Sequence, residues 1–233
     1  MAFRRFNSHL SEITRVEAVD GTTIQRPDLI RDGIAADALP HYSPGALGVA
    51  LSHRGIWQDC VRSGSPCTVA EDDAVFNLHF EQKAAGMIAS LPPNWDLILW
   101  GWNFDSPLEV DVLPGMSRSA MFFRGTTLGS NVHKFQSLRH ETVALRLLGA
   151  FGIVGYSASV NGAQTLLDKC FPLREEGIPI PSLQQTNWNT GLDVVLNKLY
   201  PTLHAYVCVP PLVWTENDKT TSDINHAPQP PAT

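Results

Sequence analysis

The fold of this chain is decided by the stretch Gly45-Ala-Leu-Gly48-Val-Ala-Leu-Ser52-His53, which is followed by Trp57, by the apolar run 67–70 and by Glu71-Asp72-Asp73. Ser43 and Pro44 precede it, and these residue types favour the N-cap and the first position of a helix. Apolar residues then recur at helical spacing, which predicts a helix over residues 43–62. The run 67–70 predicts a buried strand that ends directly on the three acids.

Three adjacent carboxylates repel one another, and a divalent cation makes their convergence favourable. Along an extended chain, Glu71 and Asp73 face one way and Asp72 faces the other. Such a pair of acids is suited to hold a hard metal ion against a diphosphate. On these residues alone, a solvated acidic turn is an equally good interpretation.

The composition sets the outer limits. The chain has 233 residues, of which 43% are hydrophobic and 17% charged, enough to bury the core of one large domain. A net charge of -6 without Lys/Arg blocks argues against nucleic acid and against an anionic membrane as partners. The four cysteines form no C-x-x-C pair, and neither a signal-peptide pattern nor an apolar run of membrane-spanning length is present. We therefore expect reduced thiols in a cytoplasmic protein.

The remaining patterns alternate between helix and strand in the manner of an α/β fold. They predict a single domain over residues 1–225 with a mixed, mostly parallel sheet, and a disordered Pro-rich tail over residues 226–233. The expected strands are residues 14–19, 67–70, 96–100, 153–159 and 204–209. The expected helices are residues 1–13, 43–62, 81–90, 141–148 and 162–170, the last with Asn161 as its cap. The capping box Thr190-Gly-Leu-Asp193 is expected to open a further helix, which ends at residue 200. Residues 103–140 are expected to be rich in loops.

The pattern Gly45-x-x-Gly48-x-x-x-Ser52-His53-x-x-x-Trp57, followed by the strand into Glu71-Asp72-Asp73, resembles glycosyltransferase family 25. This family includes bacterial lipooligosaccharide galactosyltransferases and procollagen galactosyltransferases. Further similarities keep the order of the family and extend over residues 12–224. They comprise residues 15–21, Asp96-Leu-Ile-Leu-Trp-Gly101, Tyr156-x-x-Ser159-x-x-Gly162-Ala163, Leu192-Asp193, Tyr206-Val-x-x-Pro210-Pro211-Leu212 and Ser222-Asp223-Ile224.

The resemblance implies a glycosyltransferase-A-like fold and transfer of a hexose, often galactose, from a UDP-sugar to a glycan or hydroxyl acceptor, as in lipopolysaccharide biosynthesis. Inversion at the anomeric carbon is implied as well. A manganese or magnesium ion is expected on Glu71 and Asp73, with Asp223 as a third ligand; a solvated tail is the alternative for Asp223. The donor is expected to contact Ala18, Asp20, Ser52, His53 and Asp72.

Inversion requires a base that takes the proton of the acceptor hydroxyl. Asp193 is the candidate, because the positive end of a helix dipole favours its ionised form. The same residue is also a plain member of a capping box. His53 lies on an apolar helix face, where a histidine is more often a packed, hydrogen-bonded core residue. Trp57 is expected in the core.

Members of the family typically begin with an apolar strand that helps form the nucleotide pocket, whereas this chain opens at Met1-Ala-Phe-Arg4-Arg5-Phe6. Two interpretations are open: either the start of the sequence is placed too late, or the sheet lacks this strand. If the strand is absent, an inactive family member that binds nucleotide or a protein partner is the main alternative. A serine hydrolase is the second alternative, because Gly155-Tyr-Ser157-Ala-Ser159 approaches Gly-x-Ser-x-Gly but lacks the last glycine. A metal-dependent phosphatase or nuclease would be expected to bring more metal-binding side chains.

Overall fold

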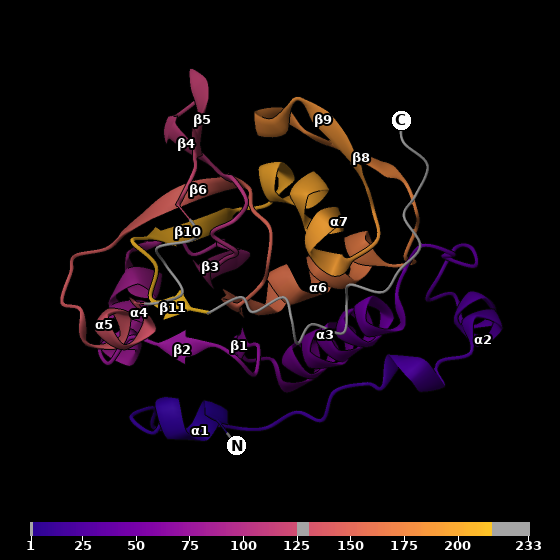
Figure 1. Ribbon diagram of the computed structural model, residues 1–233, viewed down its shortest axis with the longest axis horizontal. Helices are drawn as coiled ribbons and strands as arrows, with labels where there is room; N and C mark the ends of the chain where they lie inside the picture. Colours follow the sequence, from indigo (N-terminus) through magenta and orange to yellow (C-terminus); the bar gives the residue numbers. More distant parts are fainter. Residues whose placement is uncertain (1, 125–130, 216–233) are drawn as a thin grey trace.

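Strand β3 (Leu97–Gly101) is the centre of the fold, and all five of its residues are buried. The structure is a computed structural model that describes residues 2–124 and 131–215. β3 belongs to a seven-stranded sheet with the order β1-β7-β3-β10-β6-β4-β5 (Figure 1). The other strands of this sheet are β1 (Cys67–Ala70), β4 (Leu108–Leu113), β5 (Ser117–Met121), β6 (Val143–Gly149), β7 (Gly155–Ala158) and β10 (Ala205–Val209).

The sheet is mixed, as predicted, but the expectation that it is mostly parallel is wrong. Only β3 and β10 pair in parallel, whereas the other five neighbouring pairs of the sheet are antiparallel. The reason lies in the connections. β7 returns between β1 and β3 and runs against both, and a short turn joins β4 to β5, which enforces an antiparallel pair.

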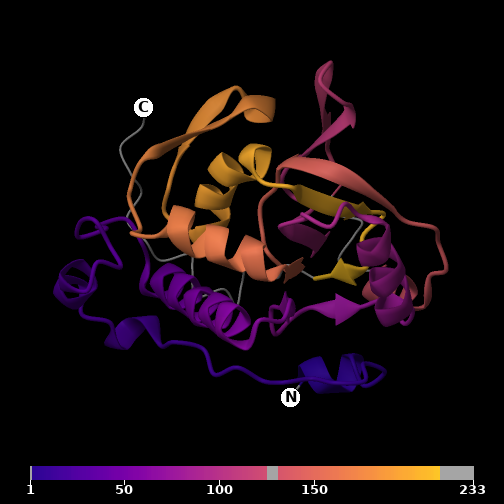
Figure 2. The same cartoon turned by 180° about the vertical axis from the view of Figure 1, so that it is seen from behind.

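Helices cover both faces of the sheet (Figure 2). Alternate residues of a strand point to opposite faces, so Leu97 and Leu99 pack in one apolar cluster, and Ile98 and Trp100 in a second one. The first cluster includes residues of α3 (Pro44–Ser63), α6 (Val160–Cys170) and α7 (Leu192–Leu199). The second includes residues of α4 (Phe80–Ser90) and of the two-stranded sheet formed by β2 (Val75–Phe76) and β11 (Val213–Trp214).

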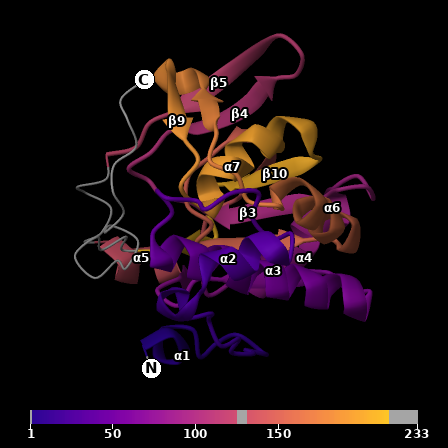
Figure 3. The ribbon, with the colours of Figure 1, turned by 90° about the vertical axis from the view of Figure 1, so that its right-hand side faces the viewer.

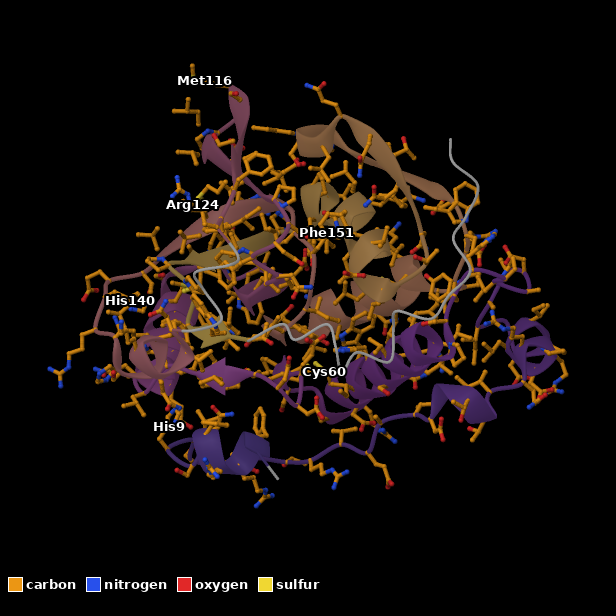
Figure 4. All side chains as sticks on the ribbon, in the orientation of Figure 1. His9, Cys60, Met116, Arg124, His140 and Phe151 are labelled. Atoms are coloured by element: carbon orange, nitrogen blue, oxygen red, sulfur yellow. The ribbon has the colours of Figure 1, made fainter. Side chains whose placement is uncertain are left out.

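Smaller elements lie around this core. A β8–β9 hairpin (Gly177–Ile180 and Gln185–Trp188) arches over α7, and the β4–β5 hairpin projects with Met116 near its tip (Figures 1 and 4). The short helices are α1 (Ala2–Phe6), α2 (Arg26–Arg31) and α5 (Val132–Ser137). Three of these elements, β4, β5 and α5, fall within residues 103–140, which were expected to be rich in loops.

Several predicted elements are confirmed, namely the helices near residues 43–62 and 81–90 and the strands near residues 67–70, 96–100, 153–159 and 204–209. The predicted helix over residues 141–148 is wrong. This segment is β6, where pairing with β10 and β4 overrides the helix preference of its Ala, Leu and Arg residues. The cap of α6 is Ser159 rather than Asn161.

The N-terminal segment also differs from the prediction. Its helix covers only Ala2–Phe6, and residues 14–19 are extended but pair with no strand among the described residues. The segment passes along α3 on the outside of the molecule (Figure 3). Val19 N donates to Ser52 Oγ at 2.9 Å, and a Cβ on Gly48 would stand 2.5 Å from Val19 O. Gly48 is therefore required by the close approach of this segment to α3.

Candidate active site

Glu71 and Asp73 lie in a turn directly after β1. Glu71 N donates to Val154 O at 3.0 Å, and Ala74 N donates to Glu71 O at 3.2 Å, which closes the turn. Glu71 is half-buried, whereas Asp72 and Asp73 are exposed. Asp73 Oδ2 accepts a hydrogen bond from Thr215 Oγ1 at 2.5 Å. The two predicted metal ligands are thus anchored to two different parts of the fold, the connection between β6 and β7 and the residue after β11.

Asp193 lies in the first turn of α7, but the predicted capping box does not form. The N-cap of α7 is Gly191, which has no side chain for this role, and the helix begins at Leu192. The carboxylate of Asp193 turns instead toward the β6–β7 connection, where its Oδ2 accepts a hydrogen bond from Gly152 N at 3.3 Å. Asp193 therefore bonds to the loop instead of completing a capping box.

The β6–β7 loop, which we define as residues 150–154, joins these acids. Ala150 bonds to the side chain of Asn197, Phe151 O accepts from Asn103 N at 2.8 Å, Gly152 N bonds to Asp193 and Val154 O bonds to Glu71. Figure 4 labels Phe151, which lies between the central strands and α7. The left-handed φ of 77° at Gly152 favours glycine. A Cβ there would also stand 2.4 Å from the side chain of Asn103.

The carboxylates influence one another. Burial, followed by the charges of Asp73, Asp193 and Asp72, raises the pKa of Glu71 to about 8. Burial also raises the pKa of Asp193 above its ordinary value. Within the part of the chain that the structure describes, no Lys or Arg side chain forms an ion pair with any of these four acids. Residues distant in sequence therefore form one negatively charged region, which no Lys or Arg among the described residues balances by an ion pair.

The donor set of this region fits a hard divalent ion. Its members are carboxylate oxygens, and a cation would favour the ionised form of Glu71, which its surroundings disfavour. Among residues 2–124 and 131–215, however, no three His, Cys, Asp or Glu side chains gather closely enough to hold a metal ion. The expected third ligand, Asp223, lies outside the described residues.

Three residues expected at the donor lie near the N-terminal half of α3. Ala18 is exposed and precedes Val19, whose amide bonds to Ser52. Ser52 Oγ also donates to Gly48 O at 2.7 Å. Asp20 Oδ1 accepts from the Thr22 hydroxyl at 2.6 Å and from Thr22 N at 2.9 Å, bonds that lower the pKa of Asp20. The assignment of Ala18, Asp20, Ser52 and Asp72 to the donor stays a prediction.

His53 is placed inside the core, on the face where the alternative interpretation expected it. Its exposed fraction is 7%, and its Nδ1 lies 2.8 Å from Tyr156 Oη. Trp57, which is buried as predicted, donates from Nε1 to the same Oη at 2.7 Å. Burial lowers the pKa of His53 to about 4, so the ring is neutral near pH 7. The role of His53 at the donor stays a prediction.

Ser157, the nucleophile of the hydrolase alternative, is in β7 and 2% exposed. Its Oγ lies 2.7 Å from Thr68 Oγ1 and accepts from Trp100 Nε1 at 2.8 Å. A nucleophile elbow requires an exposed serine on a sharp turn, whereas this one is buried within a strand. The structure therefore gives the hydrolase alternative no support.

Sequence reasoning missed four residues that organise the region: Asn103, Gly152, Asn197 and Thr215. For Asn197 a signal was present, because Leu192-Asp-Val-Val-Leu-Asn197 places an amide within an otherwise apolar helical pattern. A buried amide there must find hydrogen-bond partners. The sequence holds no comparable signal for Asn103 or Thr215.

Comparison with known proteins shows the family of this chain. The sequence profile of "Glycosyltransferase family 25 (LPS biosynthesis protein)" matches residues 1–181, and the chain therefore belongs to glycosyltransferase family 25. The "Probable inactive glycosyltransferase 25 family member 3" of Rattus norvegicus is 32% identical over 117 residues, which cover 43% of this chain and 20% of that relative. The "Inactive glycosyltransferase 25 family member 3" of Mus musculus is likewise 32% identical over 117 residues, covering 43% of this chain and 19% of the relative.

A similar protein of Bos taurus, also named "Probable inactive glycosyltransferase 25 family member 3", is 30% identical over 114 residues, covering 43% of this chain and 19% of the relative. The matches to these curated relatives thus span about a fifth of their length. In residues 2–124 and 131–215, no helix has the length and apolar character needed to cross a bilayer.

Proposed function

We propose that this chain is an inverting, metal-dependent hexosyltransferase that moves a hexose from a UDP-sugar to a hydroxyl group of a glycan acceptor. Galactose is the hexose that we propose. The observation that carries the proposal is the meeting of Glu71 and Asp193 at the β6–β7 loop. These acids are far apart in sequence, yet their main-chain and side-chain bonds end on Val154 and Gly152 of one short loop. Membership of glycosyltransferase family 25 supports the same reaction class.

Asp193 is the proposed base. It lies in the first turn of α7, where the helix dipole favours an ionised carboxylate. Its Oδ2 accepts a long bond of 3.3 Å from Gly152 N, and Oδ1 takes no part in that bond and can accept a proton. The main-chain amides of Val194 and of Asp193 itself also stabilise the ionised carboxylate. A pKa raised by burial brings the group closer to the operating pH, which makes proton transfer from an acceptor hydroxyl more favourable.

Glu71 and Asp73 would hold the manganese or magnesium ion, with Asp223 as a further ligand. When bound, such an ion offsets the charge that grows on the departing nucleoside diphosphate. The bond from Thr215 Oγ1 orients the Asp73 carboxylate, and the closed turn of residues 71–74 holds Glu71 beside it. Both features organise the two acids before a ligand arrives, which reduces the cost of binding.

Binding of nucleotide without turnover is the second candidate. It is favoured by the names of the matched relatives, which describe inactive members of the family. The two candidates share the donor and differ in the acceptor step. They are therefore separated by whether bound UDP-sugar is consumed.

The test compares wild type, Asp73→Ala, Asp193→Asn and the control Asp168→Ala, whose carboxylate is exposed on α6. Calorimetry measures UDP-galactose binding with and without Mn²⁺, and release of UDP measures turnover. We expect manganese-dependent binding by wild type and by the control, and loss of that dependence in Asp73→Ala. Asp193→Asn should keep donor binding and lose about 10²–10⁴-fold in kcat, the usual contribution of a general base.

Equal, manganese-dependent binding by wild type and Asp73→Ala would contradict the metal assignment. Binding by wild type without consumption of any UDP-sugar, across a panel of glycan acceptors, would instead favour the inactive alternative. An unchanged kcat in Asp193→Asn would remove Asp193 as the base while leaving the reaction class intact.

A further inference from the structure

The side chain of Asn197 is the strongest link between α7 and the β6–β7 loop. Its Oδ1 accepts from Ala150 N at 2.9 Å, and its Nδ2 donates to Ala150 O at 2.8 Å and to Asp193 O at 2.9 Å. The side chain thus satisfies both main-chain groups of one loop residue and also bonds to the backbone of Asp193. A side-chain amide, which carries a donor and an acceptor on one rigid plane, makes this pattern directly.

Asn197 places a polar side chain on the buried, apolar face of α7. Its neighbours on α7, Val195, Leu196 and Leu199, are buried apolar residues, and Asn197 itself is only 8% exposed. An apolar residue at this position would avoid burying an amide, which destabilises the fold unless all its bonds are made. The Asn197 amide therefore contributes a fixed position rather than stability, because its bonds hold the β6–β7 loop in one place along α7.

The position of the loop decides the position of both acids. Two residues beyond Ala150, Gly152 N donates to Asp193 Oδ2, and Val154 O then accepts from Glu71 N. A shift of Ala150 along α7 would move both of these bonds together. Close packing opposes such a shift, because a Cβ on the preceding residue, Gly149, would stand 3.1 Å from Asn197 Oδ1.

We propose that Asn197 is a positioning residue of the transfer reaction, which holds the β6–β7 loop in register with α7 and so sets the place of the Asp193 carboxylate relative to Glu71. This inference rests on the proposed function. Asn197 does not touch the substrate in this proposal and acts through Asp193. Displacement of a catalytic group by about 1 Å can cost on the order of 100-fold in rate.

The first variants are Asn197→Ala and Asn197→Ser. A serine hydroxyl within a helix bonds to the carbonyl oxygen four residues earlier, so Asn197→Ser keeps a bond to Asp193 O and loses the two bonds to Ala150. The control is Asn77→Ala, because Asn77 is fully buried and donates from Nδ2 to Phe135 O at 3.1 Å and to Leu138 O at 2.9 Å, away from α7. If Asn197→Ala does not fold, Asn197→Ser alone is used for the comparison with Asn77→Ala.

For both Asn197 variants we expect a fall in kcat of about 10- to 100-fold, with the KM for UDP-sugar within about twofold of wild type. Asn77→Ala should lower the melting temperature by a similar amount and leave kcat unchanged. Equal losses of kcat in the Asn197 variants and in the control would show a general effect of lost stability and overturn the proposal.

A double variant tests the route of the effect. If Asn197 acts through Asp193, then Asn197→Ser combined with Asp193→Asn should be no slower than Asp193→Asn alone. Losses that multiply would show that Asn197 acts independently of Asp193, which also overturns the proposal.

Hydrogen exchange separates failure of this inference from failure of the proposed function, because it requires no turnover. The amides of Gly152 and Glu71 should exchange at least about tenfold faster in Asn197→Ser than in wild type, and at the wild-type rate in Asn77→Ala. Unchanged exchange at both amides would show that Asn197 does not hold the loop. A wild-type protein without transferase activity would contradict the proposed function, while faster exchange would still establish the link from Asn197 to both acids.

Discussion

Acidification should weaken the fold through His53. We infer that Trp57 Nε1–H donates to Tyr156 Oη and that the Tyr156 hydroxyl donates to Nδ1 of a neutral His53. The pKa of His53 falls from 6.5 in the unfolded chain to about 4 in the folded protein because burial disfavours the imidazolium. Between these values the unfolded state binds more protons than the folded state. The contribution of the neutral ring is therefore fully present above pH 6.5 and is lost as the pH falls toward 4.

The size of this effect follows from the shift. A difference of one pKa unit corresponds to about 1.4 kcal/mol, so the loss is about 2 kcal/mol by pH 5 and about 3 kcal/mol by pH 4. Urea denaturation of wild type and His53→Gln at pH 7, 6 and 5 measures it. Other titrating groups are common to both proteins and cancel in the difference between them.

Glutamine does not titrate, so the stability advantage of wild type over His53→Gln should shrink by about 2 kcal/mol between pH 7 and pH 5. A difference between the two proteins that stays constant with pH would refute the inferred burial and neutrality of His53. It would also reopen the interpretation of His53 as an accessible group at the donor site.

Two further predictions concern the packing beneath the site. In α3, Gly48→Ala should lower the free energy of unfolding by about 1–3 kcal/mol, because its Cβ would meet Val19 O. Gly55→Ala, which has no neighbour within 4 Å of a new Cβ, should raise that free energy by about 0.5–1 kcal/mol in urea denaturation. Destabilisation of equal size at both positions would contradict the close approach of residues 18–21. Ser157→Ala should lower the free energy of unfolding by about 1–3 kcal/mol, because Trp100 Nε1 loses its acceptor, and should leave kcat unchanged. A fluorophosphonate should not label the wild type, and labelling at Ser157 would revive the hydrolase alternative.

The sequence predicted those elements whose local signals agree with their packing. The α3 helix has its predicted N-cap, because Ser43 Oγ accepts from Ala46 N at 3.0 Å. The β6 strand was missed for the opposite reason. Its sequence Val-Ala-Leu-Arg-Leu-Leu-Gly suits a helix, and only its pairing partners β10 and β4 make it a strand. The parallel character of the sheet was misjudged because strand order and direction depend on such long-range pairing.

The adjacent acids of the candidate site could be proposed from the sequence, whereas the contacts across the fold that position them could not. Glu71 and Asp73 stand out in the sequence by their charge at the end of an apolar strand. The partners that position them, Val154 O and Thr215 Oγ1, contribute one main-chain oxygen and one common side chain, neither of which marks its role in a sequence. Asp193 was proposed as the base because it was expected in the first turn of a helix, and it does lie in the first turn of α7. The capping box that was its alternative role does not form, and its carboxylate bonds to Gly152 N instead.

The arrangement of the acids bears on whether the chain turns over substrate or only binds it. The fold holds the β6–β7 loop through main-chain groups and through Asn197, and these bonds would survive the loss of the carboxylates of Glu71 and Asp73. A chain that served only as a scaffold would gain stability by replacing Glu71 with a neutral residue, since burial and the neighbouring carboxylates disfavour its ionised form. Glu71 and Asp73 form no ion pair with a Lys or Arg in the described part of the chain, which suits the divalent cation that we propose there. This charge suits both candidates, and the proposed base Asp193 is the feature that favours transfer over binding alone.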